Sequence, residues 1–292
     1  MNAAFKSTVQ GKRLPTRNDE YLLYQTLVGA WPIEWPKGAR EFTDRIKAYM
    51  LKAAREAKVH TSWLNQDAEF EAALATFIER ALAFDEFGWD MDSAVRGIMR
   101  AGFVNSLAQC LLKITSPGLP DFYQGTELWN FRLVDPDNRV AVDYESARAM
   151  LDTMRAEEER DAEALARSLR ERMEDGRAKL FLTYKALGFR KAHAELYQRG
   201  KYIALDVTGP ASDNIVAFAR VLGDEAAITI VPRLMGADGS MSLEGTHIVL
   251  PEAMGDRRFV DVVTGRQVPS DVGQIKAADA LSAFHVALLV IS

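Results

Sequence analysis

The sequence predicts an α+β protein in which a mostly helical part precedes a domain of antiparallel strands. Up to about residue 192, apolar residues recur at spacings of three and four, which is the period of an amphipathic helix. From Lys201 onward the period changes to two, in short runs rich in valine and isoleucine that Gly, Pro and Asp separate. Such a series is typical of an antiparallel β-sandwich, and the boundary between the two parts lies near 195–201.

Composition and charge exclude several classes of protein. The chain has 292 residues, 48% of them hydrophobic and 26% charged, which is ordinary for a globular protein of about two domains. Its net charge of −5 gives no basic surface for nucleic acid. No apolar run is long enough to span a membrane, and residues 1–11 lack the apolar core of a secretory signal. We therefore expect a cytoplasmic protein that binds neither nucleic acid nor a membrane.

Helices are expected from about residue 18 to residue 192. Residues 1–17 are polar and without periodic pattern, which indicates a flexible lead-in. Asn18 and Asp19 are suitable N-cap residues for a short helix that ends near Gly29, and Asn65 is suitable for a later helix. Apolar stripes predict the other helices at residues 40–57, 66–84, 92–115, 144–154, 161–174 and 177–192.

The strands are expected in six runs of alternating residues. They are YIALDV (202–207), NIVAFARV (214–221), AAITIV (226–231), THIVLP (246–251), RFVDVV (258–263) and HVALLVIS (285–292). The one cysteine, Cys110, lies in an apolar run and is expected to be a buried core residue.

Binding chemistry is expected between Ser116 and Tyr144, where turn residues, aromatic residues and polar residues are concentrated. Residues 119–124 fit a short buried strand that ends at Gly125. The segment DPDNR (135–139) can hydrogen-bond sugar hydroxyls, or its Asp and Asn side chains can simply hold a tight loop. It lacks the glycine and the distal glutamate of a calcium loop.

Other side chains near this stretch have a binding and a structural interpretation. Tyr123, Gln124 and Glu127 lie around the end of the expected strand, where they can reach a ligand, pack, or face solvent. Trp129 can stack on a sugar ring or belong to the core, and His60 can contact a ligand or be structural. The four histidines are far apart and the chain has one cysteine, so no metal site is predicted.

Several long motifs resemble the maltooligosyltrehalose synthases, which belong to the α-amylase superfamily of (β/α)8-barrel glycosidases. The motifs are GLPDFYQGTELW, LVDPDNR and VDY in the central stretch, LPTRNDEYLLYQTLVGAWP (14–32), AKVHTSWLNQD (57–67) and YIALDVTGP (202–210). The resemblance covers only the C-terminal part of such an enzyme. It implies a helical insert at 18–100, the last strand and helices of a partial (β/α)8 barrel at 101–195, and a β-sandwich at 196–292.

The resemblance also implies an activity. The family converts the reducing-end α-1,4 bond of a maltooligosaccharide into an α,α-1,1 bond by retaining intramolecular transglucosylation, a glucosylmutase (isomerase) reaction of trehalose biosynthesis. No cofactor is implied. The three catalytic carboxylates of the superfamily lie on the fourth, fifth and seventh barrel strands, before the matching region. We therefore name no catalytic residue and expect this chain to be inactive alone.

The positions that match the family's motif are expected to bind α-1,4-glucan: Tyr123, Gln124, Glu127, Asp135, Asp137, Asn138 and Arg139. Val140 and Ala141 replace the arginine and proline that the family commonly has there. Three interpretations stay open. The chain is a fragment of a longer reading frame, one half of a split enzyme that pairs with a separate N-terminal barrel half, or a non-catalytic α-glucan-binding or scaffold protein.

Overall fold

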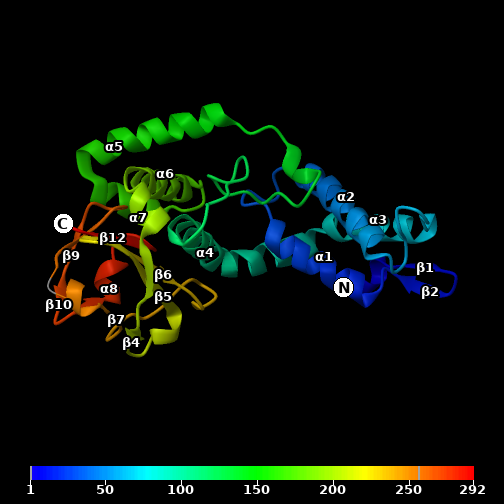
Figure 1. Cartoon of the computed structure of the whole chain (residues 1–292). Helices are drawn as coiled ribbons and strands as arrows, with labels where there is room; N and C mark the ends of the chain where they lie inside the picture. Colours follow the sequence, from blue (N-terminus) through cyan, green and yellow to red (C-terminus); the bar gives the residue numbers. More distant parts are fainter. Residues whose placement is uncertain (1, 256) are drawn as a thin grey trace. The chain divides into compact units, whose positions relative to one another are not determined.

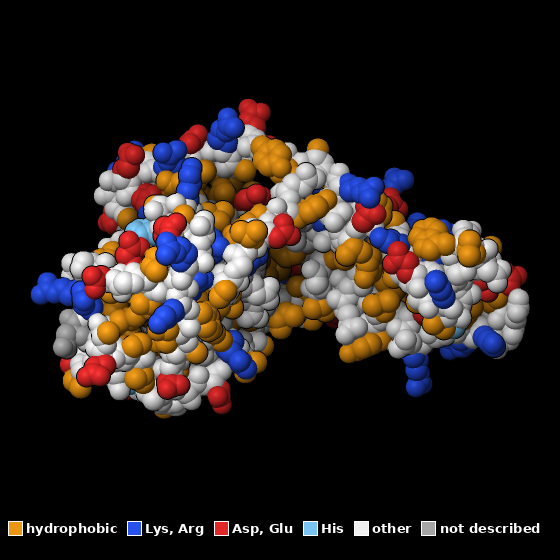
Figure 2. All heavy atoms as spheres, viewed as in Figure 1, with side chains coloured by type: hydrophobic (Ala, Val, Ile, Leu, Met, Phe, Trp, Pro, Cys, Tyr) orange, Lys and Arg blue, Asp and Glu red, His pale blue; other side chains and the backbone are white. Residues whose placement is uncertain are grey.

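The computed structural model describes residues 2–255 and 257–292, and the chain divides into two compact units (Figure 1). Unit 1 runs up to Gly97 and also contains Phe131–Ala141. Unit 2 consists of Ile98–Asn130 and Val142–Ser292. Helix α4 (Asp85–Thr115) contributes residues to both. Figure 2 shows acidic and basic side chains interspersed on the visible face, without a large patch of one sign.

Unit 1 is built from helices and one hairpin: α1 (Arg17–Ala30), α2 (Ala39–Ala57), α3 (Ala68–Leu82), the start of α4, the 3-10 helices η1 (Asn2–Phe5) and η2 (Asp137–Arg139), and strands β1 (Ser7–Val9) and β2 (Lys12–Leu14). The predicted caps are shifted. Thr16 caps α1 in a capping box with Asp19, and Asp67 rather than Asn65 caps α3. The hairpin at residues 7–14 is not predicted by the sequence. The largest fully buried side chains of the unit include Trp31, Phe70 and Phe77.

The helices of unit 2 are the remainder of α4, α5 (Tyr144–Glu171), α6 (Arg177–Ala192), α7 (Ala194–Arg199) and the short α8 (Ala277–Ala280). The two helices predicted at 144–154 and 161–174 are one kinked element. Asp161 has non-helical backbone angles, and its carboxylate accepts a hydrogen bond of 2.9 Å from the Ala164 N–H. This side chain therefore caps the second segment, which keeps the chain helical after the kink. Helix α6 has the predicted bounds.

Two antiparallel sheets form the rest of unit 2. The larger has the order β3-β5-β6-β12-β8-β9 and the smaller β10-β11-β7-β4. Each of the six predicted runs overlaps at least one strand; β9, β10 and β11 are not predicted. The strands are β3 (Lys201–Ala204), β4 (Val207–Thr208), β5 (Ile215–Leu222), β6 (Glu225–Pro232), β7 (His247–Val249), β8 (Phe259–Asp261), β9 (Gln267–Val268), β10 (Ser270–Asp271), β11 (Gln274–Lys276) and β12 (Ala287–Ile291), with the 3-10 turns η3 (Ser212–Asn214) and η4 (Glu252–Met254).

One buried cluster joins the two sheets. Ile228 and Leu289 of the larger sheet share it with Ile248 and Ile275 of the smaller sheet, and all four side chains are fully buried. Burial of this kind contributes about 25 cal/mol for each Å² of apolar surface removed from water. Alternate apolar residues of the predicted strands, mainly isoleucine, leucine and alanine, supply this shared core.

The predicted strand at residues 119–124 is wrong. The segment has no regular secondary structure, and Tyr123 and Gln124 are exposed instead of buried. A single extended segment gains its hydrogen bonds only from a neighbouring strand, and no segment of the described residues pairs with it. Cys110 is buried, as predicted, with its Sγ 3.4 Å from the Thr183 hydroxyl. None of the described helices combines the length and the apolarity that crossing a bilayer requires.

Asp261 is a buried carboxylate at the end of β8. It accepts hydrogen bonds from the Thr264 hydroxyl at 2.7 Å and from the N–H groups of Val263 and Leu288 at 3.2 Å. Burial nevertheless raises the pKa of Asp261 to about 6, because a buried anion loses its hydration. The folded protein therefore keeps a proton at pH values where the unfolded chain releases it.

This raised pKa predicts a pH dependence of stability. The free energy of unfolding should fall by about 3 kcal/mol at most as the pH rises from the unfolded pKa of about 4 toward the folded value. At higher pH it should level off. Asp261→Asn should flatten this part of the profile, which urea unfolding at a series of pH values measures. An unchanged slope in the variant would show that Asp261 does not titrate as argued.

Candidate functional site

The loop of residues 116–130 lies in unit 2 and is held at both ends. Arg190 donates hydrogen bonds to the carbonyl oxygens of Ile114 and Gly118, the second at 2.6 Å. The Lys113 ammonium lies 3.6 Å from the centre of the Phe122 ring. Gly125 has a φ of +79°, and a Cβ there would lie 3.1 Å from the Val142 side chain. The turn after Tyr123 therefore depends on a glycine.

The three predicted site residues of this loop differ in their surroundings. Tyr123 is 47% exposed and Gln124 is exposed, and neither side chain makes a hydrogen bond to any described residue. Glu127 is half-buried. Burial lowers the pKa of the Lys179 ammonium, and the nearby Glu127 carboxylate acts in the opposite direction. Tyr123 and Gln124 thus present unengaged polar groups, whereas Glu127 lies within the electrostatic range of a cation.

Trp129 is a packing residue in this structure. Its ring is stacked on Phe103, with centroids 4.6 Å apart and planes at 15°. The indole N–H donates to the Met173 carbonyl oxygen, and the Lys179 ammonium lies 5.8 Å from the ring centre. One ring face is occupied and the polar atom is satisfied, so the structural interpretation of Trp129 is the one that the contacts support.

The DPDNR loop lies in unit 1 and is held by α2. The Arg45 guanidinium donates to both carboxylate oxygens of Asp137, at 2.8 and 2.9 Å, and to the Phe131 carbonyl oxygen at 3.0 Å. The Leu133 N–H donates to Asp137 at 2.7 Å. Burial opposes ionisation of Asp137, but these hydrogen bonds outweigh it and lower the pKa of the carboxyl. Asp137 is therefore an anion that fixes the loop.

The other residues of this loop are less tightly held. Asp135 and Arg139 form an ion pair with each other, and the Lys52 ammonium donates to the Asp135 carbonyl oxygen. The Asn138 side-chain oxygen is buried without a hydrogen-bond partner among the described residues. A hollow of about 630 Å³ lies between this loop and α2, lined by Arg40, Glu41, Asp44, Arg45, Ala48, Tyr49 and residues 134–137. It combines apolar and aromatic surface with a few charged groups, the mixture that small-molecule sites have.

Comparisons with known proteins show which proteins this chain is similar to. No family model matches the chain. A putative maltooligosyl trehalose synthase of Mycobacterium tuberculosis is 31% identical over 271 residues, which are 92% of this chain and 31% of that protein. The structure of maltooligosyltrehalose synthase from Arthrobacter ramosus is 32% identical, with a TM-score of 0.76 over 94% of this chain and 32% of its own. Another maltooligosyl trehalose synthase structure is 34% identical, with a TM-score of 0.71 over 94% of this chain and 33% of its own.

The predicted resemblance to the maltooligosyltrehalose synthases is confirmed. The chain spans about one third of the length of the synthases it matches, consistent with their C-terminal portion.

In this synthase-like chain, the predicted site residues fall into two groups. Tyr123, Gln124 and Glu127 lie in unit 2, whereas residues 135–139 lie in unit 1. Each group is brought together by its own unit. That both groups bind one glucan remains a prediction from the synthase motif.

Sequence reasoning missed Arg45 and Lys52, which hold the DPDNR loop of the synthase-like chain. They are seven residues apart, so they lie on one side of α2. Their spacing does place them together, but nothing in the sequence indicates that Asp137, 92 residues further on, is the partner of Arg45. His60 lies against Phe70, with ring centres 4.7 Å apart, and its Nε2 is 3.8 Å from Asp19.

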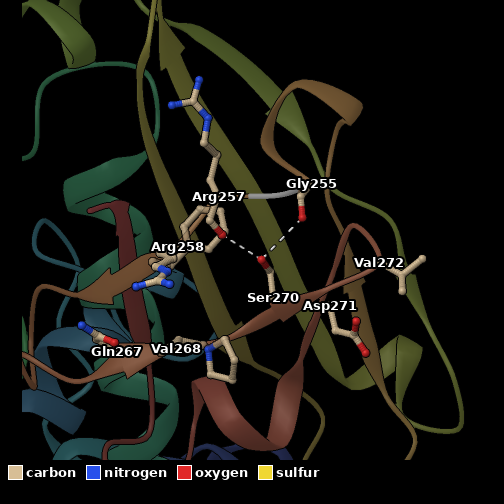
Figure 3. A pocket seen from close by; sticks show the side chains of 10 residues that line it. Gly255, Arg257, Arg258, Gln267, Val268, Ser270, Asp271 and Val272 are labelled. Atoms are coloured by element: carbon tan, nitrogen blue, oxygen red, sulfur yellow. Dashed lines mark hydrogen bonds between the residues drawn. The ribbon is translucent and has the colours of Figure 1, made fainter.

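A second hollow, of about 560 Å³, lies at the β8–β10 end of the sheets (Figure 3). The Ser270 hydroxyl there donates to the Arg257 carbonyl oxygen at 2.8 Å. Phe259, the aromatic residue that lines this hollow, is fully buried and offers no free ring face for a sugar. None of its lining residues belongs to the synthase motif. Within residues 2–255 and 257–292, no group of three or more His, Cys, Asp or Glu side chains is placed to hold a metal ion.

Proposed function

We propose that these 292 residues form the C-terminal portion of a maltooligosyltrehalose synthase that acts on maltooligosaccharides. The reaction converts the reducing-end α-1,4 bond into an α,α-1,1 bond with retention, which requires a carboxylate nucleophile and an acid that becomes a base. The observation that carries the proposal is the match to the Arthrobacter ramosus synthase over 94% of this chain, which includes both units.

The architecture that accompanies this proposal has three parts after residues 1–17, which were expected as a lead-in and carry η1 and the β1–β2 hairpin. Residues 18–100 form the helical insert, 101–195 the end of a (β/α)8 barrel, and 196–292 a β-sandwich. The cluster shared by the two antiparallel sheets supports the third part. The second part contains helices but no strand, so its assignment as a barrel end rests on the match to the synthases alone.

The residues proposed to contact glucan are Tyr123, Gln124, Glu127, Asp135, Asp137, Asn138 and Arg139. Unengaged side chains support the assignment of Tyr123 and Gln124. Both carboxylate oxygens of Asp137 accept hydrogen bonds from Arg45, so the main role of Asp137 is to position the loop that carries the other residues. The catalytic carboxylates belong to barrel strands outside the matching region, and on this account the chain alone has no turnover.

The proposal is tested in a fused protein in which this chain replaces the matching third of the Arthrobacter ramosus synthase. We expect the fused protein to consume the reducing ends of maltopentaose. A fused protein that folds, binds maltopentaose and shows no turnover would contradict the proposal and favour a non-catalytic α-glucan-binding protein.

Tyr123→Phe in the fused protein should lower kcat/KM about tenfold, because a hydroxyl that binds substrate contributes about 1 kcal/mol or more. Steady-state kinetics with maltopentaose measure the change. Tyr202→Phe is the matched control, since Tyr202 is exposed to the same degree (49%) on β3. Equal kinetics for both variants would remove Tyr123 from the glucan site.

A further inference from the structure

A third hollow, of about 310 Å³, belongs to unit 2 and is not part of the glucan site proposed above. It opens to solvent, because the lining residues Arg100, Asp238 and Ser240 are exposed. Its walls come from α4, α5, the loop between β6 and β7, and the segment before β12 (Figure 1). The polar side chains that line it are those of Arg100, Arg170, Asp238, Ser240 and His285. Two arginines and an imidazole from three separate elements thus surround one small cavity.

The two arginines are incompletely paired. Arg170 donates to the carbonyl oxygens of Leu281, at 2.7 Å, and Ser282, which leaves donors of its fork unused. Arg100 makes no hydrogen bond and no ion pair with any described residue. Burial lowers the pKa of Arg170 and the charge of Arg100 lowers it further, whereas the Glu171 carboxylate acts in the opposite direction. Both guanidinium-bearing side chains line the same hollow, where their charges repel each other.

His285 adds an unsatisfied polar atom to the same cavity. Its Nε2 is buried and has no hydrogen-bond partner among the described residues. Burial, Arg170 and Arg100 together lower the pKa of His285 to about 4, so the ring is neutral at neutral pH. A buried nitrogen without a partner is costly to folding. A bound group that could accept a hydrogen bond from His285 in its protonated form would relieve this cost.

The charges around the cavity do not cancel. Asp238 is the carboxylate among the lining residues, and its Oδ1 accepts the Ser240 N–H at 2.9 Å. The loop approaches α4 closely, because a Cβ at Gly239 would lie 3.2 Å from the Arg100 Cγ. Among the lining side chains, two guanidinium groups against one carboxylate leave an excess of positive charge in a partly apolar, solvent-open hollow. The Glu171 carboxylate acts on Arg170 from outside the lining.

We propose that this cavity binds a phosphate dianion, either free or as the monoester of a small metabolite. Guanidinium forks match the geometry of phosphate oxygens, so Arg100 and Arg170 would donate to them. The charge of the bound anion would raise the pKa of His285, and the protonated Nε2 would then donate as well. A volume of about 310 Å³ is at the lower end of ligand pockets and suits a small anion. The proposal is independent of the glucan function.

The first test is isothermal titration of the 292-residue chain with inorganic phosphate and with glucose 6-phosphate, at constant ionic strength kept with chloride. We expect saturable binding to one site and a loss of about tenfold or more in affinity for Arg100→Gln. This variant is chosen because Arg100 has no partner whose loss would unfold the protein. Arg199→Gln, which changes an arginine outside the cavity, should bind as the wild type does.

The second test is the NMR titration of the histidine rings, of which the chain has four. Ligand should shift the ring signals that disappear in His285→Gln and should raise the pKa of that ring. Tighter binding of glucose 6-phosphate would identify a metabolite ester, and equal or tighter binding of inorganic phosphate would identify the free ion. Absence of saturable binding, or unchanged affinity in Arg100→Gln, would overturn the proposal.

Discussion

Arg220→Met should lower the free energy of unfolding of unit 2 by about 3–5 kcal/mol. Arg220 lies on β5 and is only 2% exposed. Its Nη2 donates to the carbonyl oxygens of Tyr197 at 2.8 Å and Gly200 at 2.9 Å. Each hydrogen bond to a charged group contributes about 1.5–3 kcal/mol, and the carbonyl groups would be left buried without it.

The surroundings explain why a cation is stable here without a carboxylate. The Arg220 guanidinium also approaches the Thr115 carbonyl oxygen at 3.4 Å and the Tyr197 ring at 5.7 Å. Thr115 ends α4, and Tyr197 lies in the last turn of α7, where the helix dipole places partial negative charge. Arg220 therefore links the ends of two helices to the larger sheet.

Urea unfolding monitored by circular dichroism measures this effect. Arg220→Lys keeps the charge but loses the two-pronged guanidinium. Its free energy of unfolding should therefore lie between those of the wild type and Arg220→Met. Arg199→Gln is the control, because Arg199 forms an exposed ion pair with Glu195 on the helix surface, where such pairs contribute little. A loss below about 1 kcal/mol for Arg220→Met would contradict the account, because even one net hydrogen bond contributes that much.

The Arg45–Asp137 pair should show a coupling free energy of about 2 kcal/mol in a double-mutant cycle. Both side chains are mostly buried, with 20% and 12% exposed, and the contact is bidentate. Arg45→Gln and Asp137→Asn each remove the ion pair and keep a polar side chain. In the fused synthase, either variant should also lower turnover, because the DPDNR loop loses its attachment to α2.

The pH dependence gives this pair an independent signature. The lowered pKa of Asp137 means that its contribution is present above the unfolded pKa of about 4 and is lost as the pH falls through the folded value. The stability difference between wild type and Asp137→Asn should therefore shrink in acid. The pair is not coupled if the two substitutions change the free energy of unfolding additively. The same conclusion follows if the stability difference between wild type and Asp137→Asn does not depend on pH.

The sequence predicts those elements whose own residues carry a full periodic pattern. Helix α6 and the strands β5, β6 and β12 are of this kind, since each buries a regular face. Strands β9 and β10 have two residues each and exist only through their neighbours, so they leave no period in the sequence. The expected strand at 119–124 has a suitable pattern, but no segment of the described chain pairs with it.

The candidate site shows the same limit. The motif around DPDNR identifies the loop, but the structural role of Asp137 depends on an arginine 92 residues earlier in the chain. The sequence allows Trp129 to stack on a sugar, whereas in the structure its ring packs on Phe103 and its indole N–H donates to the Met173 carbonyl oxygen. Pairings of this kind arise from tertiary structure and have no local signal.

The most direct test of the account measures the loss of reducing ends from maltopentaose. The purified chain is assayed alone and after mixing with a separate polypeptide that contains the remaining two thirds of the Arthrobacter ramosus synthase. We predict no turnover by either polypeptide alone and turnover by the mixture. Turnover by the 292-residue chain alone would contradict the central claim, because it would place the catalytic carboxylates within these residues.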